Sequence, residues 1–453
     1  MDARKIRLDC KTTSAVNPRA VFDEHNERLG RIAGRLTTCY AGYPNRDKII
    51  SLLSYWLYGY RCILACYGIE AAIRFCRSGF GSHVRFAYLH EYGIDTNLRR
   101  KMIAAGCLFG LAAGFMSAAY LPGGRVNSIY SKLLWRLTKF AVMGAPVAVR
   151  EARKKEIVGA LVECFDGYDA GVIEKSLHDG LPPVFTADQI RFPWKQALRV
   201  DCSALSFMEF CGYENLFLFD RRLHVTGRQH GGGYDVCSVD YWVHFEKQLC
   251  DEFIGWGMSR TNERQHKFSA HDRPAQSDRG VRRLIWVERA RMPFLLYAMS
   301  PALYAQGVNK SVIDYVCDEL RSVEGGFFSL PYPGLLRSDD YAGKRGDELA
   351  AGSRGGESVI RADDVLIFDS MGGSLIHYCI EHGISLVIVL GRGDIPQLSE
   401  RAAEWLGVLR SAGLAFLDDE HGLLSRRLTE IIAERSGLPA RVESYHLERF
   451  KDI

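Results

Sequence analysis

The sequence has no large excess of charge of either sign. Lysine and arginine together number 58 and aspartate and glutamate 54, which gives a formal net charge of +4. Proteins that bind nucleic acid through their surface charge carry a marked basic excess, so we expect no nucleic-acid partner. Hydrophobic residues make up 47% of the 453 residues, as in ordinary globular proteins, and this length predicts two or three domains.

The sequence also lacks the pattern of a disulfide framework or a zinc site. Its 13 cysteines are scattered, the closest pair being Cys62 and Cys66, and no CxxC pair or Cys and His cluster with zinc spacing occurs. No signal peptide is evident at the start of the chain. We therefore expect reduced, buried thiols, no metal and a cytoplasmic location.

Long apolar runs are scarce, and the longest uncharged one covers residues 102–121. It is long enough to cross a bilayer, but it is rich in Ala and Gly, so burial within the protein is the favoured interpretation. A segment that docks on a membrane is the alternative. The basic residues between 125 and 155 fit a solvated helix face better than a membrane-binding one. A peripheral contact with the inner face of the cytoplasmic membrane stays open.

Two junctions in which a predicted strand meets a glycine turn are the main features present. In the first, β-favouring runs at 216–219 and 223–227 lead into Gln229-His230-Gly231-Gly232-Gly233. Ligands of open α/β sheets bind beyond the carboxyl ends of the strands, so Gln229 and His230 are expected to face a cleft.

The second junction lies about 140 residues downstream. An apolar strand at 363–370 leads into Gly372-Gly373, and a helix at 374–383 closes with Gly383 at its C-terminal cap. Another buried strand follows at 385–390, so this part of the chain predicts a parallel β-α-β unit.

The predicted fold class is α/β, with two Rossmann-like lobes facing a cleft and extra N-terminal helices. The hydrophilic stretch 259–280 has the composition of a linker, which divides the chain into lobes at 1–275 and 276–453. The remaining patterns predict helices at 25–36, 48–75, 398–413 and 421–437 and a short strand at 183–188. Trp56, Tyr58 and Tyr60 have the helical spacing of core residues rather than of a sugar-stacking platform.

The second junction has the features of a phosphate site. Backbone N–H groups of Gly372, Gly373 and Ser374 and the Ser374 hydroxyl converge at the positive end of a helix. The motif is neither a P-loop nor GxGxxG, and Ser374 as a simple helix N-cap is an equally good interpretation.

Other side chains at strand ends and turns are candidates for catalysis. His230 is a candidate general acid or base, or a donor to a developing anion. Asp188, Asp220 and Asp369 each end a predicted strand and are candidates for nucleophile or base. The residue types alone do not rank the three carboxylates.

Several motifs resemble those of bacterial surface-carbohydrate biosynthesis transferases. QHGGGYD at 229–235, followed by Asp251-Glu252 and Gly255-Trp256-Gly257, resembles the QHGG and WGW stretch of this family. The further similar stretches are 45–57, 182–188, 331–334, 339–341, 362–389 and 408–424. These enzymes look related to the retaining Kdo transferases of capsule and O-antigen assembly, which have the GT-B arrangement of two Rossmann-like lobes.

The resemblance implies a metal-independent glycosyltransferase with no cofactor other than its nucleotide-sugar donor. The donor, such as a CMP-linked ulosonic acid like Kdo, would bind the C-terminal lobe, and a glycan or lipid-linked glycan acceptor would bind the N-terminal lobe. Asp188 would be the nucleophile and His230 would assist at the phosphate or the acceptor. The implied nucleotide-binding residues are Gln229, Gly231, Gly232, Tyr332, Asp369, Ser370, Gly372, Gly373 and Ser374.

Two other functions stay open. A two-lobed sugar-nucleotide epimerase would use the same cleft. A catalytically inactive scaffold of a polysaccharide assembly complex would be docked through residues 102–121 and the basic residues that follow.

Overall fold

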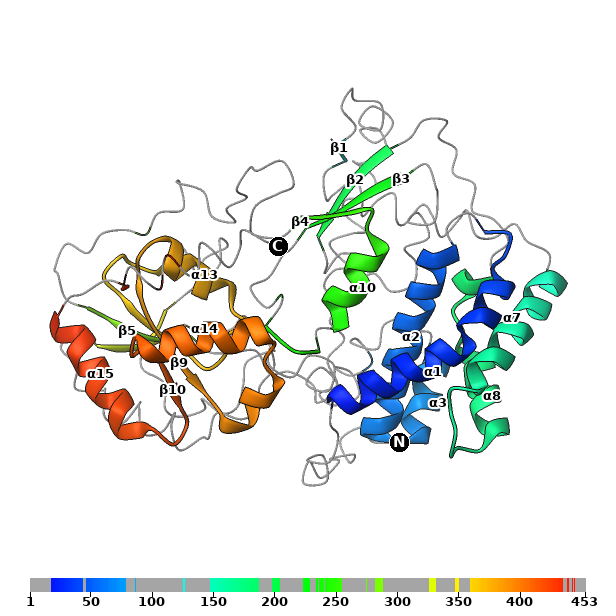
Figure 1. Ribbon diagram of the computed structural model, residues 1–453, viewed down its shortest axis with the longest axis horizontal. Helices are drawn as coiled ribbons and strands as arrows, with labels where there is room; N and C mark the ends of the chain where they lie inside the picture. Colours follow the sequence, from blue (N-terminus) through cyan, green and yellow to red (C-terminus); the bar gives the residue numbers. More distant parts are fainter. Residues whose placement is uncertain are drawn as a thin grey trace. The chain divides into compact units, whose positions relative to one another are not determined.

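The structure, a computed structural model of the chain, divides into two compact units (Figure 1). It describes residues 18–43, 46–78, 86, 125–126, 147–186, 198–203, 223–228, 234, 236–239, 241–254, 274, 282–287, 326–330, 347–349, 359–434, 438–439, 442 and 444. The N-terminal unit contains the described residues up to Arg228 together with Tyr241–Ile254, and the C-terminal unit contains the others. The lobe boundary predicted between 275 and 276 lies outside the described residues and stays a prediction.

Several helices pack on one another in the N-terminal unit. They are α1 (Pro18–Cys39), α2 (Arg46–Tyr67), α3 (Ile69–Ser78), α7 (Val147–Val162) and α8 (Ala170–Gly180). Trp56, Tyr58 and Tyr60 of α2 are at most 1% exposed, which confirms that they are core residues. The single helix predicted at 48–75 is wrong, because the chain turns at Gly68, whose φ of 80° costs glycine little, and separates α2 from α3.

A parallel sheet belongs to the same unit. Its strands are β1 (Arg125–Val126), β2 (Leu198–Ser203), β3 (Leu223–Arg228) and β4 (Glu252–Ile254). Among these described strands the spatial order follows the chain, so no reversal of order is seen here. Helix α10 (Tyr241–Leu249) connects β3 to β4 and packs on α2, where the rings of Phe245 and Tyr55 lie 5.6 Å apart. The strand predicted at 223–227 is confirmed as β3.

The strand predicted at 183–188 is wrong, because Pro183–Thr186 forms the 3-10 helix η4. The Tyr40 hydroxyl donates to the Phe185 carbonyl at 3.0 Å, and the Arg153 guanidinium donates to the Thr186 carbonyl at 3.5 Å. Side chains thus take the carbonyl groups that a strand would pair with its neighbour. Asp188 lies outside the described residues.

The C-terminal unit is built on a six-stranded parallel sheet with the order β7-β6-β5-β8-β9-β10 among its described strands. The strands are β5 (Leu284–Val287), β6 (Phe327–Leu330), β7 (Asp347–Glu348), β8 (Val365–Phe368), β9 (Ser385–Leu390) and β10 (Ala415–Leu417). Every residue of β8 and β9 is buried, as is typical of parallel strands covered on both faces.

The predicted β-α-β unit is confirmed in this sheet. Helix α13 (Ser374–Glu381) connects β8 to β9, which pair in parallel, and the helix ends before Gly383 with φ 65°. The 3-10 helix η11 (Arg392–Gln397) and helices α14 (Glu400–Ser411) and α15 (His421–Glu434) complete the unit (Figure 1). The strand β10 between α14 and α15 was not predicted. The fold class is therefore α/β, with a Rossmann-like C-terminal sheet.

A short segment between β3 and α10 belongs to the C-terminal unit. Val236 and Cys237 are 1% and 4% exposed and lie in the hydrophobic core of this unit. The Ser238 N–H donates to the Gln397 carbonyl at 2.8 Å, and the Ser399 N–H donates to the Val236 carbonyl at 3.0 Å. The chain therefore contributes to the C-terminal unit before it returns to the N-terminal unit at α10.

Among the described helices, α2 alone is long and apolar enough to cross a bilayer by length and composition. Its most apolar window is 78% buried inside the unit, and buried core helices meet the same criteria. The apolar run at 102–121 lies outside the described residues.

His25 is a buried, neutral histidine between α1 and α2. Its side chain is inaccessible to solvent, and its Nε2 lies 3.1 Å from the Ser54 hydroxyl. Burial above all, together with the nearby Arg61 and His244, lowers the pKa of His25 to about 3. In the unfolded chain the His25 imidazole should bind a proton near pH 6.5, whereas in the folded chain it stays neutral at that pH.

We expect His25 to make the protein sensitive to acid. Above pH 6.5 the free energy of unfolding does not depend on the protonation of His25. As the pH drops from 6.5 towards 3, the free energy of unfolding should fall by about 1.4 kcal/mol per pH unit. The variant His25→Asn cannot titrate and keeps an amide for Ser54. Urea unfolding at several pH values should show a weaker acid dependence in the variant, and equal slopes would contradict this role.

Gly180 allows α8 to approach α3 closely. A Cβ at this position would lie 2.2 Å from the Cys76 sulfur and 2.7 Å from the Cys76 Cα. The second of these atoms belongs to the backbone, so a side-chain rotation cannot relieve the clash.

The change Gly180→Ala should lower the free energy of unfolding by about 2 kcal/mol or more. The matched control is Gly159→Ala on α7, where a Cβ meets nothing within 4 Å. That change should stabilise the protein by about 0.5–1 kcal/mol through helix propensity. Thermal unfolding of both variants measures the difference, and equal midpoints would argue against the close approach.

Candidate functional site

The strand order of the C-terminal sheet reverses between β5 and β8. From β5 the sheet continues through β6 to β7 on one side and through β8 to β10 on the other. In open α/β sheets the crevice beyond the carboxyl ends of the strands at such a reversal is the usual ligand site. Binding residues are therefore expected in the turn that leaves β8 at this point.

The turn from β8 to α13 contains Asp369, Ser370, Gly372 and Gly373 and ends at Ser374. Asp369 is only 2% exposed, whereas the residues from Gly372 to Ser374 are partly exposed. The turn thus starts in the core of the unit and opens towards solvent where the helix begins.

Helix α13 begins without a capping side chain. Its N-cap residue is Gly373, in extended conformation, and no side-chain hydrogen bond caps the helix. The interpretation of Ser374 as the N-cap is therefore wrong. By contrast, Asp169 caps α8 through the Val172 N–H, and Ser399 caps α14 through the Ala402 N–H. The first turn of α13 keeps its positive partial charge uncompensated by a cap.

The fold does not require glycine at position 373. The φ of Gly373 is −84°, an ordinary value for any residue. A Cβ there would meet Ile376 and Phe368 no closer than 3.8 Å, which is normal contact. A glycine that neither backbone strain nor packing demands is consistent with the close approach of a ligand to this backbone.

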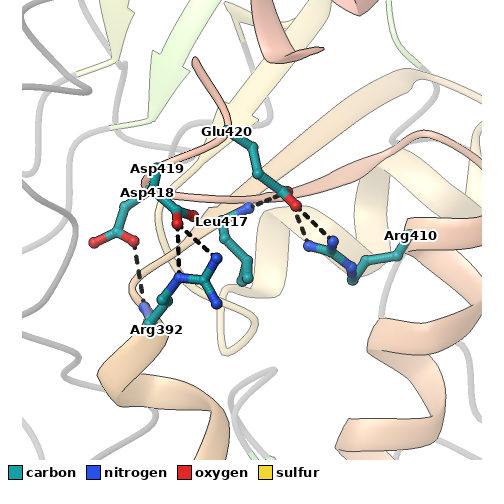
Figure 2. A network of polar contacts seen from close by, with 6 residues as sticks. All are labelled: Arg392, Arg410, Leu417, Asp418, Asp419 and Glu420. Carbon is teal, nitrogen blue, oxygen red and sulfur yellow. Dashed lines mark hydrogen bonds and ion pairs between the residues drawn. The ribbon is translucent and has the colours of Figure 1, made fainter. Parts of the chain in front are cut away.

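The neighbouring turns at the same edge carry a network of charged residues (Figure 2). Arg392, in the turn after β9, donates through Nε to an Asp419 carboxylate oxygen at 2.7 Å. Arg410 of α14 makes two bonds to the Glu420 carboxylate, at 3.0 and 2.7 Å. Glu420 also accepts the Leu417 N–H at 2.8 Å.

These bonds shift the pKa values of all four groups in the direction that favours ionisation. The hydrogen bond from Arg392 lowers the pKa of the Asp419 carboxyl, and that from Arg410 lowers the pKa of Glu420. The same bonds raise the pKa of both arginines. The network is therefore fully charged at neutral pH.

The predicted site residues divide between described and undescribed parts of the chain. The structure brings Asp369, Ser370, Gly372, Gly373 and Ser374 together in one turn, as chain neighbours. The predicted residues Asp188, Asp220, Gln229, His230, Gly231, Gly232 and Tyr332 lie outside the described residues.

Sequence reasoning missed Arg392 and Asp419. The signal available was the position of Arg392 two residues after the buried strand 385–390. In the part of the chain that the structure describes, no group of three or more His, Cys, Asp or Glu side chains is placed to hold a metal ion.

Comparison of the chain with protein-family models, with curated proteins and with solved structures gave no match. The candidate site is therefore defined by its residues and by the topology of the sheet.

Proposed function

We propose that the protein is a glycosyltransferase whose C-terminal unit binds a nucleotide sugar. The observation that carries this proposal is the uncapped, glycine-led start of α13 at the point where the sheet reverses its strand order. This combination of a helix N-terminus with a reversal of strand order is a common site for nucleotide phosphates.

The phosphate of the nucleotide is proposed to bind the first turn of α13. Backbone N–H groups from Gly372 to Ser374 and the Ser374 hydroxyl are the donors, and the absent side chain at Gly373 leaves room for the anion. Ser370, which is partly exposed, is proposed to bind a hydroxyl group of the donor, whereas Asp369 is buried at the start of the turn.

The proposed reaction is the transfer of an ulosonic acid such as Kdo from its CMP derivative to a glycan acceptor. The Asp188 carboxylate would attack the anomeric carbon, and CMP would leave with the electron pair of the broken bond. An acceptor hydroxyl would then displace Asp188, with His230 assisting proton transfer, so configuration is retained. The sequence resemblance alone suggests this chemistry and the surface-polysaccharide acceptor.

Nucleotide binding should depend on position 373. Titration calorimetry with CMP, CDP and UDP should detect binding of one of them to the wild-type protein. In Gly373→Asp the new carboxylate would cap α13 and repel phosphate, so binding should be lost while thermal stability stays equal or rises by a few tenths of a kcal/mol.

The matched control is Gly407→Ala on α14, where a Cβ meets nothing within 4 Å. It should bind nucleotide as the wild type does. A wild-type protein that binds none of the three nucleotides would favour the scaffold instead. Unchanged binding in Gly373→Asp would remove the turn from the site.

Transfer itself should depend on Asp188. The change Asp188→Asn should abolish release of CMP from the CMP-linked donor in the presence of acceptor, because an amide is a poor nucleophile, while CMP binding is unchanged. Asp220→Asn is the comparison variant and should retain activity. Wild-type turnover in Asp188→Asn would exclude the proposed role, and CMP release that never requires an acceptor would argue against a transferase.

A further inference from the structure

Arg392 has a position from which it could serve the site at the β8–α13 turn. We propose that Arg392 binds the anionic group of the ligand there, and that Asp419 holds Arg392 while no ligand is bound. This inference rests on the proposed nucleotide-binding role of the turn, and it adds a cationic side chain to a phosphate site made of backbone N–H groups and the Ser374 hydroxyl.

The register of the strands places Arg392 and the β8–α13 turn at the same edge of two adjacent strands. Ile388 of β9 pairs with Phe368 of β8, so Arg392 and Gly372 each follow this pair by four residues. Adjacent strands lie about 4.8 Å apart, and arginine has a long side chain. Among the described residues that directly follow β8, β9 and β10, Arg392 is the one basic residue.

The backbone around Arg392 is fixed while its side chain is exposed. The Gly391 N–H donates to the Asp394 carboxylate at 3.1 Å, and the Arg392 N–H donates to the Asp418 carboxylate at 3.4 Å. The Arg392 side chain is nevertheless 66% exposed. An arginine on a fixed backbone can exchange one anionic partner for another without a change in the fold.

The partner that Arg392 has in this structure is easily exchanged. Asp419 is 52% exposed, and ion pairs between such exposed groups contribute little to stability. Arg392 contacts one oxygen of the Asp419 carboxylate through both Nε and Nη2, and a phosphate or a sugar carboxylate offers oxygens that the same two donors can bind. Asp419 follows β10, on the other side of β9 from β8, so the exposed guanidinium would leave it in order to bind an anion at the β8–α13 turn.

The neighbouring pair Arg410 and Glu420 has a different role and provides a matched control (Figure 2). Its side chains are 38% and 20% exposed, and Glu420 also accepts the Leu417 N–H. Glu420 directly precedes α15, so this pair joins the end of α14 to the turn between β10 and α15.

The test is calorimetric titration of the full-length chain with CMP and with free Kdo. Arg392→Gln should weaken binding of the probe that carries the recognised anion about tenfold or more, at unchanged thermal stability. Asp419→Asn should tighten binding about two- to fivefold, because Arg392 no longer has to leave a charged partner. Arg410→Gln should lower the thermal midpoint and leave affinity unchanged.

The two probes distinguish the source of the anion. Loss of CMP affinity in Arg392→Gln assigns the arginine to the phosphate, and loss of Kdo affinity assigns it to the sugar carboxylate. Wild-type affinity of Arg392→Gln for both probes, with CMP binding abolished in Gly373→Asp, would overturn this inference and leave the proposed function standing. A wild-type protein that binds neither probe would overturn this inference, and one that also binds neither CDP nor UDP would overturn the proposed function as well. Weaker binding in Asp419→Asn would contradict the holding role of Asp419.

Discussion

Burial of a parallel sheet on both faces is the constraint on which the C-terminal unit depends. Every residue of β8 and β9 is buried, so the connections between strands must run as crossovers that cover the faces of the sheet. Between β5 and β8 the order reverses, with β6 and β7 on one side of this point and β9 and β10 on the other. In open α/β sheets the carboxyl edge at such a reversal is the usual ligand site.

The two ends of β8 deal with polar groups in opposite ways. At the amino end the buried Asp364 accepts two hydrogen bonds from Arg283, at 2.8 and 2.6 Å, and one from the Arg361 N–H at 2.6 Å. A buried charge with its bonds satisfied is costly to disturb, so this end serves stability. At the carboxyl end the first turn of α13 has no capping side chain. The first backbone N–H groups of α13 can remain without a capping side chain because solvent or an anion can reach them.

The sequence predicted those elements that can be recognised within one short stretch of the chain. The apolar runs of β8 and β9 and the glycine after α13 identify a β-α-β unit by themselves. Two errors, the strand at 183–188 and the missed β10, occurred where tertiary contacts decide the structure. Residues 183–186 have a strand-like composition, but Tyr40 and Arg153 take their carbonyl groups, and the chain forms a 3-10 helix instead. The three residues of β10 are too few to show a period, and only pairing with β9 makes them a strand.

The same distinction explains which part of the candidate site could be predicted. The turn from Asp369 to Ser374 is continuous in the chain, so strand, glycines and helix could be recognised together. The role inferred for Arg392 depends on the pairing of β8 with β9 and on the ion pair with Asp419, neither of which the residue order contains. Backbone donors attract any anion, whereas a side chain held at the rim adds a donor at a set distance from them and so favours ligands whose anionic group reaches both. Specificity in such a site therefore arises from register between strands, whereas affinity for anions arises from the turn itself.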